Sequence, residues 1–339
     1  MSSERTIGID LGGTTIKGGV VDSHGTIHAQ HTLESLAEEG PSAVIRQIAI
    51  VIGKLLGQSK GADIVGIGVG APGVVTLDGG LVKHPPNFAG WTEVYLGNEL
   101  QKLFKLPVFV ENDANVAALA EARFGAGVGV NDFLFVIWGT GVGGGIILNG
   151  EIYRGPTGAA GEIGHVTIDY NGPPCNCGNR GCVEAYVGQR YLSQRTRDRL
   201  APLMGEWKQH RSGSPPSKII DLVQEKLELI EPAIISRAAE QGDRFAHEVL
   251  EEAGELLGVG IASVLNVLDL QTVIIGGGVS AVNAFVFEAV ERSVRSRVLK
   301  SAKEEIRIRQ AKLGNTAGIL GAAVLPSLRE AMRHNRQAG

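Results

Sequence analysis

The chain has 339 residues, of which 43% are apolar and 20% charged, values typical of a globular protein with about two domains. Its net charge of −4 argues against a polycationic surface for nucleic acid or acidic lipid. Glycine is the unusual component, with 48 residues, about 14% of the chain against a usual ~7%. It does not recur at every third position, which excludes collagen. We therefore expect many tight turns or close backbone approaches.

The first part of the chain alternates between predicted strands and helices. In chain order, the elements are a strand, turn and strand over residues 6–21, a strand near 26–33, a helix over 41–57, a strand over 63–70, a helix over 92–105, a strand over 107–111 and a helix over 114–124. Asn112 or Asp113 is placed to cap the last of these helices. The alternation of strands and helices is typical of an α/β protein.

A similar pattern starts about 130 residues later. Residues 7–14 and 135–141 both combine an apolar strand with a turn that contains glycine and threonine. The repeated elements are a strand over 132–138, a glycine turn over 139–145, a strand over 146–148, a hairpin signal at Asn149-Gly150 and a strand over 151–154. Two similar α/β domains facing a cleft would explain this duplication.

After residue 186 the predicted structure is mainly helical. The elements are a helix over 189–200, a loop over 205–217, helices over 218–229, 231–241 and 243–267, a strand over 272–275, a helix over 281–298, a strand near 306–311 and a helix over 316–334. We expect a smaller domain from residues 1–114 and about 313–339, and a larger one from about 115–312.

Nothing in the sequence favours a membrane protein. Residues 133–150 and 270–287 are two uncharged stretches of 18 residues, but glycine runs interrupt both. No basic and then apolar leader precedes Thr6. We therefore expect a cytoplasmic protein with no membrane partner and no nucleic-acid partner.

Three turns that contain glycine follow apolar strands and are candidates for binding phosphate. Their backbone N–H groups can surround phosphate oxygens because no Cβ blocks the approach. Asp10 adds a carboxylate that suits Mg²⁺, directly or through water. A tight connection between strands is the alternative for each turn, and the patterns of the P-loop and the dinucleotide-binding fold are absent or poorly matched. The candidate residues are Gly12, Gly13, Thr14 and Thr15, then Thr140 and Gly141, then Gly276, Gly277 and Gly278.

Glu111, Asn112 and Asp113 stand where a predicted strand gives way to a helix. In α/β sheets, ligands bind at such positions. A carboxylate at Asp113 can accept a hydroxyl proton during phosphoryl transfer. Capping of the helix is the alternative, and both roles can hold together. Glu162 and Glu184 are further candidates, although an isolated acid is more often a surface residue.

His165, Cys175, Cys177 and Cys182 are close together in the sequence. Three thiolates and one imidazole complete a tetrahedral zinc site. In a cytosolic protein, clustered cysteines are more often metal ligands than disulfides, and free or redox-active thiols are the alternative. Zinc on one imidazole nitrogen leaves the other as an N–H donor, so the metal can position groups that bind a substrate. We expect much of the glycine excess in this loop and in the three turns.

The segments 162–165 (Glu-Ile-Gly-His) and 175–184 (Cys-Asn-Cys-Gly-Asn-Arg-Gly-Cys-Val-Glu) closely resemble the signature of the ROK family, which comprises repressors, open reading frames and sugar kinases. The resemblance covers nearly the whole chain and is strongest to the bacterial ATP-dependent glucokinases of the family. The other segments that carry it are 10–17, 70–73, 111–115, 139–141 and 276–278.

This resemblance implies an α/β, actin-like ATPase fold of the hexokinase type and ATP-dependent phosphorylation of the 6-hydroxyl of glucose. It implies Asp113 as the general base, Asp10 as the residue that serves Mg²⁺, and Gly276–Gly278 on the adenosine side of an ATP site whose phosphates lie at the other two turns. It also implies a structural Zn²⁺ and a homodimer or homotetramer. The residues implied to bind the sugar, together with Asp113, are Asn112, Glu162, His165 and Glu184.

Two other functions remain open. A kinase for N-acetylmannosamine, mannose or allose would use the same acids. A sugar-responsive repressor is less favoured, because such members carry an N-terminal helix-turn-helix and the first motif here begins by residue 6. One departure from the family pattern is Thr15, where many members have lysine; Lys17 follows two positions later, so we assign no lysine to phosphate.

Overall fold

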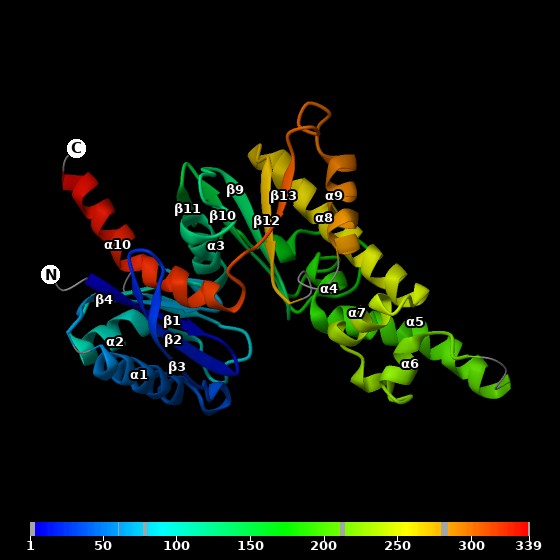
Figure 1. The fold of residues 1–339 in the computed structure, drawn as a ribbon, viewed down its shortest axis with the longest axis horizontal. Helices are drawn as coiled ribbons and strands as arrows, with labels where there is room; N and C mark the ends of the chain where they lie inside the picture. The colour runs from blue at the N-terminus through cyan, green and yellow to red at the C-terminus, as the bar shows by residue number, and fades with distance from the viewer. Residues whose placement is uncertain (1–3, 60, 77–79, 211–213, 279–283, 338–339) are drawn as a thin grey trace. The chain divides into compact units, whose positions relative to one another are not determined.

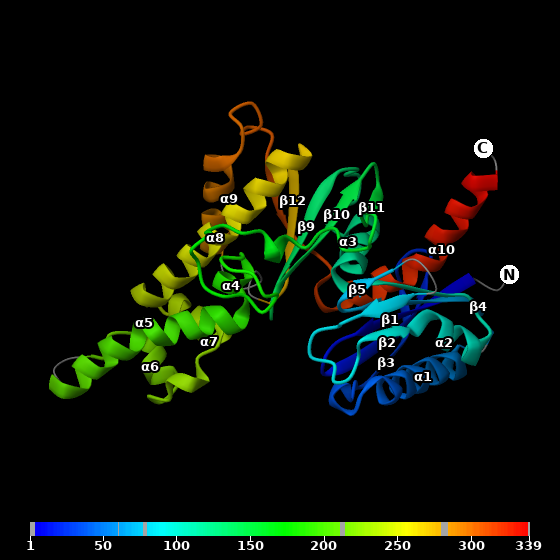
Figure 2. The same ribbon diagram turned by 180° about the vertical axis from the view of Figure 1, so that it is seen from behind.

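The computed structural model describes residues 4–59, 61–76, 80–210, 214–278 and 284–337, with side chains up to residue 328. Figures 1 and 2 show the elements from opposite sides. The strands are β1 (Glu4–Leu11), β2 (Thr15–Asp22), β3 (Ile27–Glu34), β4 (Asp63–Ala71), β5 (Val74–Val75), β6 (Leu81–Lys83), β7 (Glu93–Tyr95), β8 (Val108–Asn112), β9 (Phe133–Trp138), β10 (Val142–Leu148), β11 (Glu151–Tyr153), β12 (Thr272–Gly276) and β13 (Arg307–Gln310). The helices are α1 (Pro41–Gln58), α2 (Leu96–Phe104), α3 (Asp113–Phe124), α4 (Glu184–Val187), α5 (Gln189–His210), α6 (Lys218–Leu222), α7 (Pro232–Glu240), α8 (Arg244–Leu268), α9 (Ala284–Arg297) and α10 (Ala317–Gln337).

Two five-stranded sheets repeat one strand order. The first is β3-β2-β1-β4-β8 and the second is β11-β10-β9-β12-β13. In both, the third and fourth strands of this order are parallel, as are the fourth and fifth. The first two strands form an antiparallel hairpin in each sheet. This repetition confirms the duplication predicted from residues 7–14 and 135–141.

Contacts between residues divide the chain into two compact units. The first contains Met1–Asp132, Gly145–Gly161 and Ala311–Gly339, and the second contains Phe133–Gly144 and Glu162–Gln310. The chain passes from the second unit to the first within β10. The predicted domains, residues 1–114 with about 313–339 and residues about 115–312, stay a prediction.

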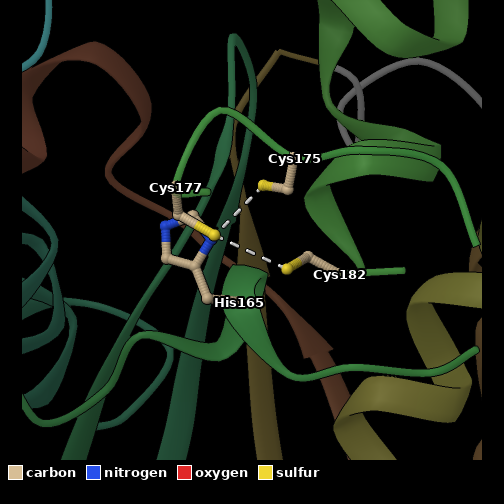
Figure 3. A group of neighbouring side chains, drawn as sticks. All are labelled: His165, Cys175, Cys177 and Cys182. Atoms are coloured by element: carbon tan, nitrogen blue, oxygen red, sulfur yellow. Dashed lines mark hydrogen bonds between the residues drawn. The ribbon is translucent and has the colours of Figure 1, made fainter. Parts of the chain in front are cut away.

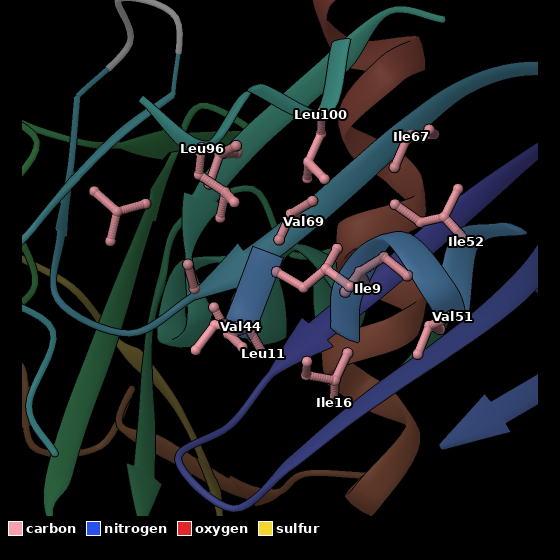
Figure 4. Packing of buried hydrophobic residues seen from close by; sticks show 14 of the residues in the cluster. Ile9, Leu11, Ile16, Val44, Val51, Ile52, Ile67, Val69, Leu96 and Leu100 are labelled. Carbon is pink, nitrogen blue, oxygen red and sulfur yellow. The ribbon is translucent and has the colours of Figure 1, made fainter. Parts of the chain in front are cut away.

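Helix α1 covers one face of the first sheet. Val44, Ile48 and Ile52 follow one another at intervals of four, so they share one side of the helix. They are fully buried in an apolar cluster with Ile9 and Ile16 of the sheet (Figure 4). Each such side chain contributes roughly 1.5–3 kcal/mol by leaving water. The helical spacing predicted over 41–57 therefore produces the core of the first unit.

Helix α10 covers the opposite face of the same sheet, and it lies unusually close. A Cβ on Gly8 would stand 2.0 Å from the Ile319 carbonyl oxygen, and one on Gly68 would stand 1.8 Å from the carbonyl oxygen of Ala322. Only glycine allows this approach. Part of the glycine excess thus serves the close approach of a helix to a sheet, at positions outside the three turns and the cysteine loop.

In the second unit, α8 and α9 pack side by side (Figure 2). Gly254 and Gly258 stand one turn apart on α8 and make this contact close: added Cβ atoms would lie 2.8 Å from the Val286 carbonyl oxygen and 2.5 Å from Ser293 Cβ. Trp138 at the end of β9 is buried, and its indole Nε1 donates to the Val187 carbonyl oxygen at 2.8 Å. That bond ties the second sheet to α4.

Some predicted elements differ from the structure in their bounds. Residues 93–95 pair with β6 as strand β7, so the helix predicted over 92–105 is shorter. Strand β10 begins at Val142, inside the predicted turn over 139–145, because the turn itself needs only residues 139–141.

The helical region after residue 186 also differs from the prediction. The segment predicted as a loop over 205–217 is helical as far as His210, and its residues 211–213 lie outside the described residues. The helix predicted over 218–229 ends at Leu222, because Gln224 and Glu225 adopt positive φ angles of 52° and 61°. Of the helix predicted over 281–298, the first three residues lie outside the described part.

Within the described residues, no helix has the length and apolar character needed to cross a membrane.

Candidate functional site

The predicted general base lies at the first residue of α3. The preceding Asn112 is extended, and its carboxamide oxygen accepts hydrogen bonds from the backbone N–H groups of Ala114 at 3.0 Å and Asn115 at 3.1 Å. Asn112 is therefore the N-cap, which resolves the choice between the two capping candidates. The Asn112 amide nitrogen also donates to the Gly73 carbonyl oxygen at 3.0 Å. These contacts fix the backbone on which Asp113 stands.

A buried ion pair supports this turn. The carboxylate of Glu111 accepts from Arg154 Nε at 2.5 Å, and the two side chains are 3% and 12% exposed. The other Glu111 oxygen accepts from the backbone N–H of Asn112 and from the side chain of Asn115, both at 3.0 Å. The sequence analysis missed Arg154, because 43 residues separate it from Glu111 and no local pattern connects them.

The first glycine turn is held from both sides. The Gly12 N–H donates to the Thr15 carbonyl oxygen at 2.9 Å, and Ser35 donates from its hydroxyl to the Gly13 carbonyl oxygen at 2.7 Å. Gly13 and Thr14 at the tip are exposed. A pre-formed turn with exposed backbone is suited to receive an anion.

Asp10 lies beside this turn at the end of β1. Burial raises the pKa of its carboxyl, and the charge of Lys17 on β2 opposes that change. A cation at Asp10 would favour the ionised form, as Mg²⁺ binding requires. The carboxylate packs against Gly318 in the first turn of α10, where an added Cβ would lie 2.5 Å from Asp10 Cγ. Gly318 is a second residue that the sequence analysis missed.

Two glycine turns lie next to each other in the second unit. Gly276 pairs in parallel with Ile137, and an added Cβ on Gly277, whose φ is +98°, would stand 2.2 Å from the Trp138 carbonyl oxygen. In the next turn, the Gly139 N–H donates to the Gly141 carbonyl oxygen at 3.0 Å. The two predicted phosphate and adenosine turns of this unit are thus brought together.

The turn over residues 139–141 is anchored by two helices. Glu184 at the start of α4 accepts from the Val142 N–H at 2.9 Å. The backbone N–H of Gln189, at the start of α5, donates to the carbonyl oxygens of Gly139 at 3.2 Å and Thr140 at 3.1 Å. Glu184, predicted for the sugar, therefore holds the end of the turn that was predicted to bind phosphate.

A cavity of about 730 Å³ adjoins this turn in the second unit. Thr140 lines it on one side, and its walls include the apolar side chains of Ile230 and Ile234 and the basic side chains of Arg190 and Arg197. Arg197 is fixed by bonds to backbone carbonyl oxygens, among them that of Ile230 at 3.0 Å. Glu228 and Glu231 also line it, so the cavity offers both apolar and charged groups to a small molecule.

The four predicted zinc ligands converge on one point (Figure 3). Their ligand atoms all lie within 4.8 Å of one another. Cys177 and Cys182 have their Sγ atoms 3.7 Å apart, and Cys175 Sγ lies 3.7 Å from His165 Nδ1. Sulfurs at ~2.3 Å from a tetrahedral zinc are about 3.8 Å apart, so the cluster has the dimensions of a zinc site. A disulfide would need ~2.05 Å.

The histidine of this cluster also faces a predicted sugar-binding acid. His165 Nε2 lies 3.9 Å from a Glu162 carboxylate oxygen, on the side of the ring away from Cys175. Burial raises the pKa of Glu162; the charge of His165 lowers it and that of Glu184 raises it. An imidazole that binds a metal through one nitrogen commonly faces a carboxylate with the other.

The repeated sheets and their glycine turns define the class of the protein. In each sheet, a glycine turn connects the central strand to the next strand along the chain, β1 to β2 in the first sheet and β9 to β10 in the second. Together with the similarity to solved sugar kinases given below, this arrangement is the actin-like ATPase fold of the hexokinase type.

The chain belongs to the ROK family, whose sequence profile matches residues 6–328. It is 34% identical over 333 residues to the glucokinase of Halalkalibacterium halodurans, with 97% of each chain covered. It is also similar to the crystal structure of a ROK family glucokinase from Streptomyces griseus in complex with glucose and AMPPNP, with a TM-score of 0.79 and 33% identity. That match covers 95% of this chain and 98% of the Streptomyces griseus chain. A xylose repressor of Bacillus spizizenii is 32% identical over 93% of this chain and 75% of its own.

Proposed function

We propose that the chain is a glucokinase, which transfers the γ-phosphoryl group of ATP to the 6-hydroxyl of glucose. The observation that carries this proposal is the similarity, over nearly the full length of both chains, to a glucokinase solved with glucose and an ATP analogue. The family signature residues Asn112, Asp113, Glu162, His165 and Glu184 are all present. The match to the xylose repressor covers only 75% of that protein's length, compared with 98% for the solved glucokinase.

In the proposed reaction, the sugar O6 attacks the γ-phosphorus, the bond from phosphorus to the β–γ bridging oxygen breaks, and ADP leaves. Asp113 accepts the proton of the 6-hydroxyl as the new O–P bond forms. Asn112, Glu162, His165 and Glu184 orient the sugar through its other hydroxyls. Most of the acceleration in such a reaction comes from positioning and charge stabilisation, which pre-formed turns supply.

The nucleotide is proposed to bind at the glycine turns. Backbone N–H groups of residues 12–15 and of Thr140 and Gly141 receive the phosphates, with Gly276–Gly278 on the adenosine side. The cavity beside Thr140 has a mixed lining, with apolar side chains that can pack on a base and polar side chains that can bond to a ribose. Asp10 is the residue that would hold Mg²⁺, which supplies charge neutralisation at the phosphates when bound.

Zinc is proposed as the structural ion of the cluster formed by His165, Cys175, Cys177 and Cys182. Burial raises the pKa of the Cys182 thiol to about 12, so a cation is needed to make it a thiolate at neutral pH. The ion would fix the loop and hold His165 toward the sugar. We also propose a homodimer or homotetramer, with the two predicted domains in each protomer.

The substrate is tested by measuring ATP consumption with a panel of glucose, mannose, allose and N-acetylmannosamine. We expect the highest kcat/KM with glucose. A strong preference for N-acetylmannosamine would replace glucokinase by another hexose kinase, and no turnover with any sugar, together with sequence-specific DNA binding, would favour a repressor.

The general base is tested by Asp113→Asn, which keeps the shape of the side chain and removes its basicity. We expect kcat to fall by about 10²–10⁴-fold, because proton transfer by a positioned group is worth that factor. Glucose binding, followed by the change in intrinsic tryptophan fluorescence, should stay within a few-fold of the wild type. Full turnover by the variant would exclude this mechanism.

Metal content is tested by elemental analysis and chelation. We expect about one zinc per chain. Its removal by a strong chelator should lower Tm and raise KM for glucose, because His165 is both a ligand and a sugar contact in the proposal. Cys177→Ala should reproduce both effects. Metal analysis that finds far less than one equivalent in active protein would exclude the zinc site.

A further inference from the structure

The pair of Glu111 and Arg154 is a buried charged group that the proposed mechanism does not use. Glu111 is 2% exposed as a residue, and Arg154 reaches it from just beyond β11, on the hairpin that β10 and β11 form. Both residues belong to the first unit. A buried carboxylate without a cation is strongly destabilising, so the two charges depend on each other.

The bonds of Glu111 surround the predicted base. One of its oxygens accepts from the backbone N–H of Asn112, the residue before Asp113, and from the side chain of Asn115, two residues after it. The other oxygen accepts from Arg154. A single carboxylate therefore holds the chain on both sides of Asp113, and Arg154 holds that carboxylate.

The orientation of Arg154 is itself fixed. Its Nε points to Glu111, while Nη1 donates to the carbonyl oxygen of Ile152 at 3.3 Å. The guanidinium thus bridges the β10–β11 hairpin and the carboxyl end of β8. Arginine suits this place because its donors are arranged in a rigid plane and its charge persists at all physiological pH values.

The geometry points to Arg154 as a positioning residue for phosphoryl transfer: through Glu111 it holds Asp113 in the place where the sugar hydroxyl gives up its proton. This inference rests on the proposed function, in which Asp113 is the base. Arg154 does not itself touch substrate here. Its loss would leave glucose and ATP bound but the base displaced, and a displacement of about 1 Å can cost about a hundredfold in rate.

The test compares Arg154→Met, Arg154→Lys and Glu111→Gln by steady-state kinetics. For Arg154→Met we expect kcat to fall about tenfold to hundredfold, with KM for glucose and for ATP within about twofold of the wild type. Arg154→Lys keeps the positive charge and should recover kcat to within about fivefold. Arg292→Met, which removes an exposed arginine paired with Glu251 and Glu255 on outer helices, is the matched control and should keep kcat.

A double-mutant cycle separates the inference from a general loss of stability. If Arg154 acts through Glu111, the kcat of Glu111→Gln with Arg154→Met should be close to that of the worse single variant. Additive losses would overturn the inference. So would an unchanged kcat in Arg154→Met, or a rise in KM for glucose alone, which would make Arg154 a direct substrate contact.

Two further measurements keep the outcomes distinct. Tm and circular dichroism show the folded fraction of each variant. If Arg154→Met does not fold, the other two variants decide. A lower kcat in Glu111→Gln, together with a kcat in Arg154→Lys within about fivefold of the wild type, then supports the inference. Asp113→Asn tests the proposed function separately. Full activity of Asp113→Asn would show that Asp113 is not the base. If Asp113→Asn is inactive but Arg154→Met is fully active, only the positioning role of Arg154 is rejected.

Discussion

Gly318 shows how one missing side chain shapes the candidate magnesium site. An added Cβ would lie 2.5–2.8 Å from the carboxylate atoms of Asp10, and the chain on which Gly318 stands is already close to the sheet. The carboxylate would have to move. Alanine in the first turn of α10 would favour the helix by about 1 kcal/mol. The contact with Asp10, rather than helix propensity, therefore explains the glycine at position 318.

The expected result for Gly318→Ala is a fall in kcat of about tenfold or more, with a Tm no higher than that of the wild type, because crowding against Asp10 offsets the helix preference of alanine. The physical reason is that the displaced Asp10 no longer meets the metal of the proposed site. Titration of kcat with Mg²⁺ should show a higher half-saturating concentration.

Gly53→Ala is the matched control for this substitution. Gly53 stands inside α1, is exposed, and has nothing within 4 Å of an added Cβ. The substitution should raise stability by roughly 0.5–1 kcal/mol and leave kcat unchanged. Equal kcat values for both alanine variants would show that the Asp10 carboxylate has no role in the reaction.

On the scale of elements, α3 holds two distant segments through one acid. Glu121 is fully buried, and its carboxylate accepts from the backbone N–H groups of Ala126 at 2.7 Å and of Lys312 and Leu313 at 2.9 Å. The first of these follows α3, and the other two precede α10. The carboxylate of Glu121 thus accepts hydrogen bonds from three backbone N–H groups that lie outside helices and strands.

Removing this acid should be costly. Glu121→Ala removes the acceptor of the Lys312 and Leu313 backbone N–H groups, at about 1–3 kcal/mol each, so we expect a loss of at least about 2 kcal/mol in the free energy of unfolding. Urea denaturation followed by circular dichroism measures it. Glu99→Ala, at an exposed pair with Lys102, should change stability by less than about 1 kcal/mol. Similar losses for both would contradict the assigned role of Glu121.

The sequence predicted those features of the elements and the site that depend on neighbouring residues. The cysteine cluster follows from short spacing, and the position of Asp113 follows from the change of strand to helix. The contacts of Glu111 with Arg154, of Asp10 with Gly318 and of Glu121 with Leu313 join residues far apart in the chain, which no local periodicity encodes. The predicted bounds of two helices were wrong for the same kind of reason: strand pairing of residues 93–95 delays the start of α2, and positive φ angles at Gln224 and Glu225 end α6 early.

On the scale of the whole molecule, the first unit combines a segment from the beginning of the chain with a segment from its end. Its sheet is formed by residues before 113, whereas α10, which covers one face of that sheet, follows the whole second unit. Without this helix, the face that contains Gly8 and Gly68 loses its cover. The two compact units therefore do not correspond to two consecutive stretches of chain, although the strands of the two sheets do.

A chain that ends at residue 316 tests this dependence. We expect it to bind a hydrophobic dye, to lose the cooperative unfolding of the first unit and to lose kinase activity, because the unit loses the buried apolar side chains of α10, among them Ile319, and its sheet face is left in water. Adding a peptide of residues 317–337 should restore part of the activity. A truncated chain with native circular dichroism and full turnover would contradict the role given to α10.

The late position of α10 also has a consequence for biosynthesis. The sheet that α10 covers leaves the ribosome early, yet about 180 residues separate Asp132 from Ala311. At roughly 5–20 residues per second, the glycine-lined face waits on the order of 10–35 s for its helix. During that interval the nascent chain presents this uncovered sheet face to chaperones and to other nascent chains. Slower translation lengthens this interval, so we expect it to lower the yield of folded protein while the stability of the folded state is unchanged.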